Sequence, residues 1–261
     1  MSEEILYSVR NGVATLTLNR PQRRNAFTLS MVNLWADLLH RADEDPAVRA
    51  IVVTGGDEAF CAGIDLDALA EVDPSALARR EFLTKDIHRV ALTLDRIDKP
   101  VIAAVAGAAV GAGMDMALMC DMRIAAESAR FSAAYVRLGV VPGDGGCYYL
   151  PRLIGTAKAL QLLLTGDTVT GAQALELGFV NTVVPDAGLQ AHAQDLAERI
   201  AQQPPLAVSL IKRTVYQSRD IDLRTALDLV ASHMGVIMTT QDHQEALSAL
   251  REKRPGTFEG K

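Results

Sequence analysis

Cysteine is scarce in this sequence of 261 residues, and positive charge is not in excess. The three cysteines, Cys61, Cys120 and Cys147, are an odd number and lack the spacing of a metal site, which suits a reducing compartment. A formal net charge of −6 provides no basic surface for nucleic acid or for an anionic membrane. An export signal has a basic segment followed by an apolar one, and the first residues show no such pattern. We therefore expect a cytoplasmic protein that binds neither nucleic acid nor membrane.

Several sequence motifs of catalysis and cofactor binding are also missing. The sequence contains no GxxxxGK[ST] loop for nucleotide phosphates, no GxGxxG fingerprint and no GxSxG nucleophile elbow. The five histidines have no HxxxH or Cys-x-x-Cys partner, and each is interpreted as a surface or structural residue: His40, His88, His192, His233 and His243. We therefore expect no metal and no dinucleotide cofactor.

The most informative stretch, residues 99–121, joins two apolar runs through three glycines. Residues 101–105 favour a strand and residues 114–119 a helix whose only polar residue is Asp115, which predicts a strand, a glycine turn and a buried helix. The first turn of such a helix offers unpaired backbone N–H groups and the positive end of the helix dipole. The turn around Ala112 is therefore a candidate to hold an oxygen that becomes negative during a reaction. Two other interpretations remain: a βα unit whose glycines serve close packing, and a membrane span of about 20 residues, against which the glycines and the aspartate argue.

The rest of the chain alternates strand and helix patterns up to residue 185. Strands are expected at 13–19, 49–54, 123–126 and 179–184, and helices at 28–44, within 67–98, at 157–164 and at 171–177. Beyond residue 185 three helices are expected, at 187–201, 206–218 and 223–253. The alternation predicts an α/β core, and the helical tail is interpreted as a layer for assembly. We therefore divide the chain into residues 1–185 and residues 186–261.

Two more glycine-bearing segments accompany the central stretch. Residues 59–66 form a second turn after a strand, and residues 139–146 form a loop that carries Asp144. Together with Asp115, these segments suit chemistry in which a carbonyl group is polarised and a proton is moved. Cys61 and Cys147 are interpreted as packing residues, because no partner base is evident for a nucleophilic thiol.

Ordered along the chain, these segments resemble the crotonase superfamily, which includes the enoyl-CoA hydratases and isomerases. The resemblance covers essentially the whole chain and rests on segments 19–26, 59–66, 99–121, 138–146, 150–155, 171–178 and 180–185. It implies a spiral of repeated ββα units with a C-terminal helical region that drives trimers or hexamers. It also implies a coenzyme A thioester as substrate, so that coenzyme A enters as part of the substrate and no separate cofactor is needed.

The resemblance also implies roles for individual residues. The backbone N–H groups of Ala62 and Ala112 match the two donors that hold the thioester oxygen in the family. Alanine at the second position departs from a glycine often present there, but a backbone donor tolerates it. The matching positions for the nucleotide and pantetheine of coenzyme A are Arg23, Arg24, Ala26, Ala62, Gly63, Ile64, Asp65 and Leu66.

The carboxylates depart from the pattern of the family's hydratases, which carry two glutamates. Asp115 occupies the first of these positions and Tyr135 the second. A tyrosine with an ordinary pKa keeps its proton at neutral pH, so Tyr135 is interpreted as a hydrogen-bond donor that orders the site. Asp144 is the candidate for the second carboxylate, and the alternative is an aspartate that only shapes the turn.

This departure favours double-bond isomerisation over hydration by a small margin. Asp115 is expected to be the main acid and base, with Asp144 second. Decarboxylation, thioester hydrolysis and a non-catalytic acyl-CoA binding protein are the remaining alternatives.

Overall fold

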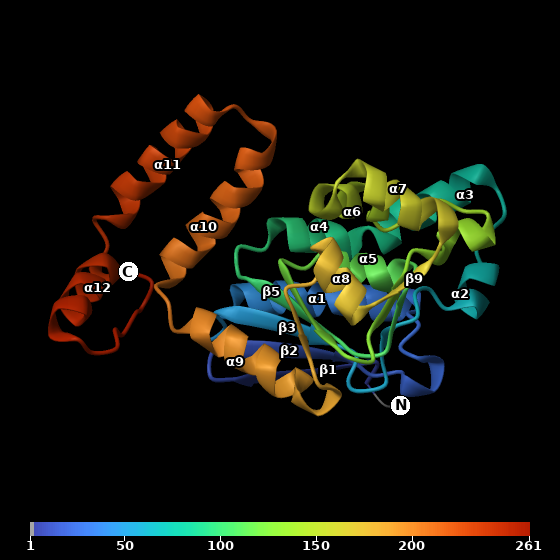
Figure 1. The fold of residues 1–261 in the computed structure, drawn as a ribbon, viewed down its shortest axis with the longest axis horizontal. Helices are drawn as coiled ribbons and strands as arrows, with labels where there is room; N and C mark the ends of the chain where they lie inside the picture. Colours follow the sequence, from blue (N-terminus) through green and yellow to red (C-terminus); the bar gives the residue numbers. More distant parts are fainter. Residues whose placement is uncertain (1–2) are drawn as a thin grey trace.

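The larger of two β-sheets has six strands in a computed structural model that describes residues 3–261 (Figure 1). Its strands lie in the order β1 (Ile5–Arg10), β2 (Val13–Leu18), β3 (Ala50–Thr54), β5 (Val101–Val105), β7 (Met122–Ala126) and β10 (Thr182–Val184). β1 and β2 pair antiparallel, and all the other neighbours are parallel. The sheet therefore gains one parallel strand with each turn of the chain.

The smaller sheet consists of the strands that follow β3, β5 and β7 in the chain, together with β9. Its order is β4 (Ala59–Cys61), β6 (Ala108–Val110), β8 (Arg130–Ser132) and β9 (Thr168–Thr170), parallel except for β8 with β9. β3 leads into β4, β5 into β6 and β7 into β8, and a helix follows each pair. This arrangement is the expected α/β spiral of repeated ββα units.

The large sheet is covered on both faces, which explains why its strands are apolar throughout. Successive side chains of a strand point to opposite faces. Ile102 and Ala104 of β5 pack with α9 (Leu189–Ala201) on one face, while Val101 and Ala103 pack in the main core on the other. That main core also contains buried residues of α1 (Leu29–Glu44), α4 (Arg89–Arg96) and α5 (Ala112–Leu118).

Helix α1 begins where the sequence predicts. Thr28 has extended backbone angles, and its hydroxyl accepts the N–H of Met31 at 3.2 Å, which satisfies one of the free donors of the first turn. Trp35, Leu38 and Leu39 lie on the buried stripe that faces the core. The helix ends at Glu44, as expected.

Other elements depart from the expected boundaries. The charged segment 67–98 divides into α2 (Leu66–Ala70), α3 (Ala76–Glu81), a π-helix η2 (Phe82–Ile87) and α4. β1 and α6 (Gly146–Ile154) are not anticipated by the sequence analysis. Further helical elements are α7 (Thr156–Thr165), α8 (Gly171–Leu177) and the 3₁₀ segments η1 (Pro21–Arg23), η3 (Ala134–Leu138), η4 (Asp186–Gly188) and η5 (Ser218–Asp220).

The predicted single helix over 223–253 is wrong. Two helices occupy this range, α11 (Leu223–Ile237) and α12 (Gln241–Glu252). The break occurs because the Thr240 hydroxyl accepts the N–H of His243 at 3.1 Å and so begins a new helix.

The C-terminal helices stand apart from the sheets. α10 (Pro205–Gln217) and α11 form a hairpin that extends away from the body in Figure 1, and neither contains a buried residue. α9 precedes this hairpin but packs on the large sheet. The division at residue 185 stays a prediction about folding units. Within residues 3–261, none of the helices combines the length and the hydrophobicity that crossing a bilayer requires.

Candidate active site

The central stretch forms the predicted strand, glycine turn and buried helix, with the short strand β6 inserted before the turn. Gly111 has a φ of +53°, a backbone conformation that favours glycine, and it directly precedes α5. Every residue of α5 is buried, and Asp115 is only 1% exposed. The turn therefore places a carboxyl group inside the protein one helical turn beyond the N-terminus of α5.

The two glycine turns of the sequence are packed against each other. A Cβ atom on Gly113 would lie 2.0 Å from the carbonyl oxygen of Cys61, so only glycine fits there. A Cβ atom on Gly63 would lie 2.9 Å from the carbonyl oxygen of Val110 and 3.5 Å from the nitrogen of Ala112. The backbone around residue 62 and the first turn of α5 are thus neighbours.

The two proposed oxyanion donors differ in their present partners. Ala112 is the first residue of α5, so its N–H has no acceptor within the helix. The Ala62 N–H donates to the carbonyl oxygen of Arg24 at 2.9 Å. Binding of a substrate oxygen at Ala62 would therefore exchange one acceptor for another.

The loop that supplies this carbonyl is firmly held. Arg24 and Asn25 both have left-handed backbone angles, with φ of 50° and 56°. The buried Asn25 amide donates to the carbonyl oxygens of Gly55 at 2.9 Å and Ala59 at 2.7 Å, and its Oδ1 accepts the N–H of Arg20 at 2.8 Å. These bonds fix the loop beside β4.

The three predicted catalytic residues lie together. The Tyr135 hydroxyl lies 2.7 Å from Oδ2 of Asp115 and 3.1 Å from Oδ2 of Asp144, in position to donate to either carboxylate. The N–H of Gly146, the first residue of α6, also donates to Asp115 Oδ2, at 2.9 Å. A hydroxyl has one proton, so Tyr135 satisfies both carboxyls best when one of them is protonated. Oδ1 of each aspartate is buried without a hydrogen-bond partner among the described residues.

Burial governs the protonation of this cluster. Desolvation raises the pKa of Asp115 to about 7, the negative charge of Asp144 adds to the rise, and the bonds from Tyr135 and Gly146 oppose it. Desolvation raises the pKa of Asp144 to about 6, with Tyr135 and the charge of His88 opposing. Burial and the two carboxylates raise the pKa of Tyr135, so it stays a donor. Burial therefore brings the pKa values of both carboxyls close to neutral, so that one of the pair can hold a proton while the other is ionised.

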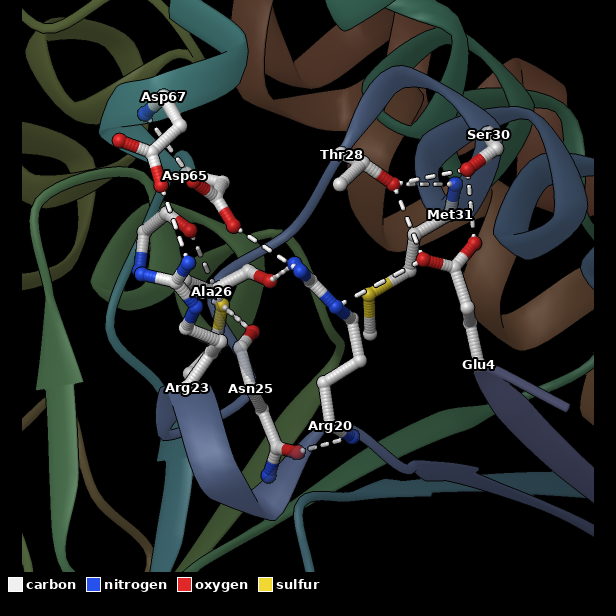
Figure 2. Close-up of polar contacts among 12 residues, drawn as sticks. Glu4, Arg20, Arg23, Asn25, Ala26, Thr28, Ser30, Met31, Asp65 and Asp67 are labelled. Carbon is white, nitrogen blue, oxygen red and sulfur yellow. Dashed lines mark hydrogen bonds and ion pairs between the residues drawn. The ribbon is translucent and has the colours of Figure 1, made fainter. Parts of the chain in front are cut away.

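A cleft of about 650 Å³ lies beside the segments predicted to bind coenzyme A. Figure 2 shows Arg20 between Glu4 and Asp65, and Arg23 directed to Asp67, with N–O distances of 3.0 Å for the Arg20–Asp65 and Arg23–Asp67 pairs. Arg23 is largely exposed, whereas Arg20 is mostly buried. The cleft is lined by both arginines but not by the buried carboxyl cluster.

Of the predicted coenzyme A residues, Arg23 and Asp65 line this cleft, and the others lie in the two adjoining segments behind its wall. Phe27 donates its N–H to the carbonyl of Gly63 at 2.8 Å and pairs with Ile64, which joins the loop after β2 to the turn after β4. Arg20 also donates to the carbonyl of Ala26 (Figure 2). Leu66, the first residue of α2, is 62% exposed.

The Asp65 side chain has internal partners. Its Oδ1 accepts the N–H of Asp67 and begins α2, and its Oδ2 accepts from Arg20. Desolvation acts to raise the pKa of Asp65, but the hydrogen bond and charge of Arg20 outweigh it and hold this pKa below its usual value. The carboxylate therefore orders the cleft wall.

The cysteines divide into buried and exposed. Cys61 is buried and donates its S–H to the carbonyl of Asn25 at 3.1 Å, and burial raises the pKa of its thiol to about 12. Cys147 is exposed, so its interpretation as a packing residue is wrong. Within residues 3–261 no group of three or more His, Cys, Asp and Glu residues is arranged to hold a metal ion.

Two residues of the site have no clear signal in the sequence. Arg20 lies in the loop after β2, and the sequence does not distinguish it from the two other arginines of that loop. In the structure it is the arginine that pairs with Asp65. His88 is interpreted from sequence as surface or structural, yet its ring nitrogen Nε2 lies 2.8 Å from the carbonyl oxygen of Gly143, next to Asp144.

Known proteins are similar to this chain in sequence and in fold. The sequence model of the family described as enoyl-CoA hydratase/isomerase matches residues 8–261. The chain is 39% identical to the 1,2-epoxyphenylacetyl-CoA isomerase of Escherichia coli (strain K12), with 100% of both chains covered. It is 37% identical to a crotonyl-CoA hydratase of Syntrophomonas wolfei, with 98% of each covered. A crystal structure of an enoyl-CoA hydratase from Bacillus anthracis superposes with a TM-score of 0.92 at 33% identity, covering 99% of this chain and 100% of that one.

Proposed function

The chain belongs to the enoyl-CoA hydratase/isomerase family, and we propose that it moves a carbon–carbon double bond within an enoyl-CoA thioester. The observation that carries this proposal is the Tyr135 hydroxyl placed between the buried carboxyls of Asp115 and Asp144. Moving a double bond requires removal of a proton at one carbon and its return at another. A base and an acid that share one hydroxyl are suited to that exchange.

The reaction balances without any co-reactant. In a 3-enoyl-CoA, the ionised carboxyl of the pair takes a proton from C2, and the electrons move into the thioester carbonyl to give a dienolate. The N–H groups of Ala112 and Ala62 hold the negative oxygen, and each such donor contributes about 3 kcal/mol of transition-state stabilisation. The protonated carboxyl then delivers a proton to C4, which leaves a conjugated 2-enoyl-CoA.

Hydration is the second candidate, because a relative named crotonyl-CoA hydratase matches over nearly its whole length. It requires a carboxylate that activates water while a second group protonates the α-carbon. The position of the second hydratase glutamate holds Tyr135, whose pKa is raised and which donates to both aspartates. Hydration here would depend on Asp144 in place of that residue.

The test follows the ultraviolet absorbance of the conjugated thioester with two substrates. With a 3-enoyl-CoA we expect absorbance to rise as the conjugated product forms. With a 2-enoyl-CoA and water we expect little loss. Rapid loss of absorbance from the second substrate would establish hydration instead. Tight binding with no change in either substrate would indicate a non-catalytic acyl-CoA binding protein.

We propose that the cleft beside Arg23 binds the nucleotide part of the substrate. The Arg23 guanidinium is exposed and pairs with the Asp67 carboxylate. A phosphate group can replace this carboxylate, because it is a stronger anion and accepts from the same planar set of N–H donors. Arg24, in the same exposed loop, supplies a second positive charge. This explains how a protein of net charge −6 can bind a polyanion.

We propose that the chain assembles into a trimer or a dimer of trimers through its C-terminal helices. Large apolar side chains are exposed along this region, among them Ile211, Leu223, Leu227 and Leu250, at 58–77% exposure. Sedimentation is expected to give three or six times the chain mass of 28.0 kDa. A single sedimenting species of one chain mass at micromolar concentration would contradict the proposal.

A cytoplasmic location remains part of the proposal. Cys61, Cys120 and Cys147 form no disulfide with one another. Free thiols, two of them buried, are compatible with a reducing compartment.

A further inference from the structure

One histidine outside the acid cluster contacts the loop that carries Asp144. Nε2 of His88 lies 2.8 Å from the carbonyl oxygen of Gly143. A carbonyl oxygen only accepts hydrogen bonds, so Nε2 must hold a proton and donate it. The bond links the residue between η2 and α4 to a residue that lies 55 positions later in the chain and immediately before Asp144.

The backbone that presents His88 is unusual. The π-helix η2 covers Phe82–Ile87 and leads directly into α4. The N–H of His88 donates to the carbonyl of Leu83 at 2.9 Å, a bond across five residues, where an α-helix spans four. A π turn inserts an extra residue and rotates the following side chain, and such turns occur frequently at functional sites. Here the rotation directs His88 toward the loop.

The loop needs an external contact to hold one conformation. Gly139 and Gly145 have φ of +69° and +110°, and glycine loses more conformational freedom on ordering than any other residue. A Cβ atom on Gly143 would lie 3.2 Å from Cδ2 of Leu83, so the loop rests on the same π turn that positions His88. The hydrogen bond and this packing contact hold the loop from one side, and Tyr135 holds Asp144 from the other.

We infer that His88 is a positioning residue, whose Nε2–H fixes the loop carbonyl of Gly143 so that the Asp144 carboxyl stays within hydrogen-bond reach of Tyr135. This inference rests on the proposed isomerisation for its catalytic consequence. His88 does not contact the reacting atoms in this assignment. It acts through the backbone, alongside its electrostatic effect on the pKa of Asp144, and a displacement of Asp144 by about 1 Å can cost about a hundredfold in rate.

The test compares three substitutions of His88 with a control. His88→Leu removes the donor, and His88→Asn carries a donor that is too short to reach Gly143. Both are expected to lower kcat by about 10–100-fold while KM for a 3-enoyl-CoA changes less than about twofold. His88→Gln places an amide N–H near the position of Nε2 and is expected to restore kcat to within about threefold of the unsubstituted protein. His40→Leu changes an exposed histidine of α1 and is expected to have no effect.

A second measurement separates this inference from the proposed function. Hydrogen exchange of the amides in 139–146 is expected to be faster in His88→Leu and His88→Asn and unchanged in His88→Gln. If the unsubstituted protein does not isomerise enoyl-CoA, the proposed function fails, and the exchange pattern still decides whether His88 holds the loop. Equal exchange in all variants, or a His88→Gln variant as slow in turnover as His88→Leu, would overturn the assignment. If His88→Leu does not fold, the comparison of the asparagine and glutamine variants decides.

Discussion

Asp115→Asn is expected to lower kcat for double-bond isomerisation by about 10²–10⁴-fold, the contribution of a positioned acid or base. Asparagine has nearly the same shape, and its amide oxygen can still accept from Tyr135 and from the N–H of Gly146. The substitution therefore removes proton transfer and leaves the packing of α5. KM should change little, because the carboxyl contributes to the transition state more than to substrate binding.

The matched control for this variant is Asp195→Asn. Asp195 is exposed on α9, the helix that covers the opposite face of the large sheet. Its amide variant is expected to keep full turnover. Full turnover in Asp115→Asn would show that Asp115 serves only as a buried acceptor for the N–H of Gly146 at the start of α6. Asp144 would then be the one remaining candidate for the catalytic carboxyl.

The same variant is expected to be more stable than the unsubstituted protein at high pH. Burial raises the pKa of Asp115 in the folded protein to about 7 from its ordinary value of 3.8. Between these values the folded protein binds more protons than the unfolded chain, so stability falls as pH rises. Asparagine removes this cost. We expect Asp115→Asn to gain about 1–3 kcal/mol at pH 8 and little at pH 4, measured by denaturant unfolding at equal protein concentration.

Arg123→Met is expected to destabilise the fold by about 3–5 kcal/mol, because it leaves several buried carbonyl groups without a donor. Arg123 is 4% exposed, and its guanidinium donates to the carbonyl of Phe179, to those of Ala117 and Leu118 at the end of α5, and to those of Cys120 and Asp121 just beyond it. The last carbonyls of a helix have no intrahelical partner. Arg123 supplies partners for them and joins α5 to the segment before β10.

Arg130→Met is the matched control for this second variant. Arg130 is an exposed arginine in β8 that also donates to backbone carbonyls, those of Glu127 and Ala129. Water can replace an exposed donor, so its loss is expected to cost less than about 0.5 kcal/mol. Equal unfolding free energies for the two variants would show that the buried bonds of Arg123 contribute no more than surface contacts.

The elements that the sequence analysis predicted correctly are those that local chemistry determines. The Thr28 cap begins α1 because the hydroxyl has an N–H within reach three residues later. The apolar runs of β5 and α5 had to be buried, and the glycines between them had to form a turn. The family pattern, and no local rule, predicted that the three site residues Asp115, Tyr135 and Asp144 belong together. Tyr135 lies 20 positions after Asp115 and 9 before Asp144, too far apart for local sequence patterns to connect them.

The features that escaped prediction depend on contacts between distant segments. His88 gains its partner only when η2 packs against the loop before α6, 55 residues later. Arg20 gains Asp65 only when the loop after β2 lies beside β4. The end of α11 was missed for a different reason, because the apolar pattern continues through Met238 and only the Thr240 hydroxyl starts a new helix.

In the role proposed for Ala62, the bond from its N–H to the Arg24 carbonyl would let the site discriminate between a neutral acyl oxygen and a negatively charged one. An amide carbonyl is a stronger hydrogen-bond acceptor than the neutral carbonyl of a thioester, so an unreacted acyl group gains little by replacing it. A dienolate oxygen carries negative charge and is a much stronger acceptor than either. In the role proposed for Ala62, the exchange of acceptors therefore becomes favourable only as the proton leaves C2. An amide N–H that already has an acceptor in the resting protein would then lower the activation free energy without increasing the affinity for the substrate.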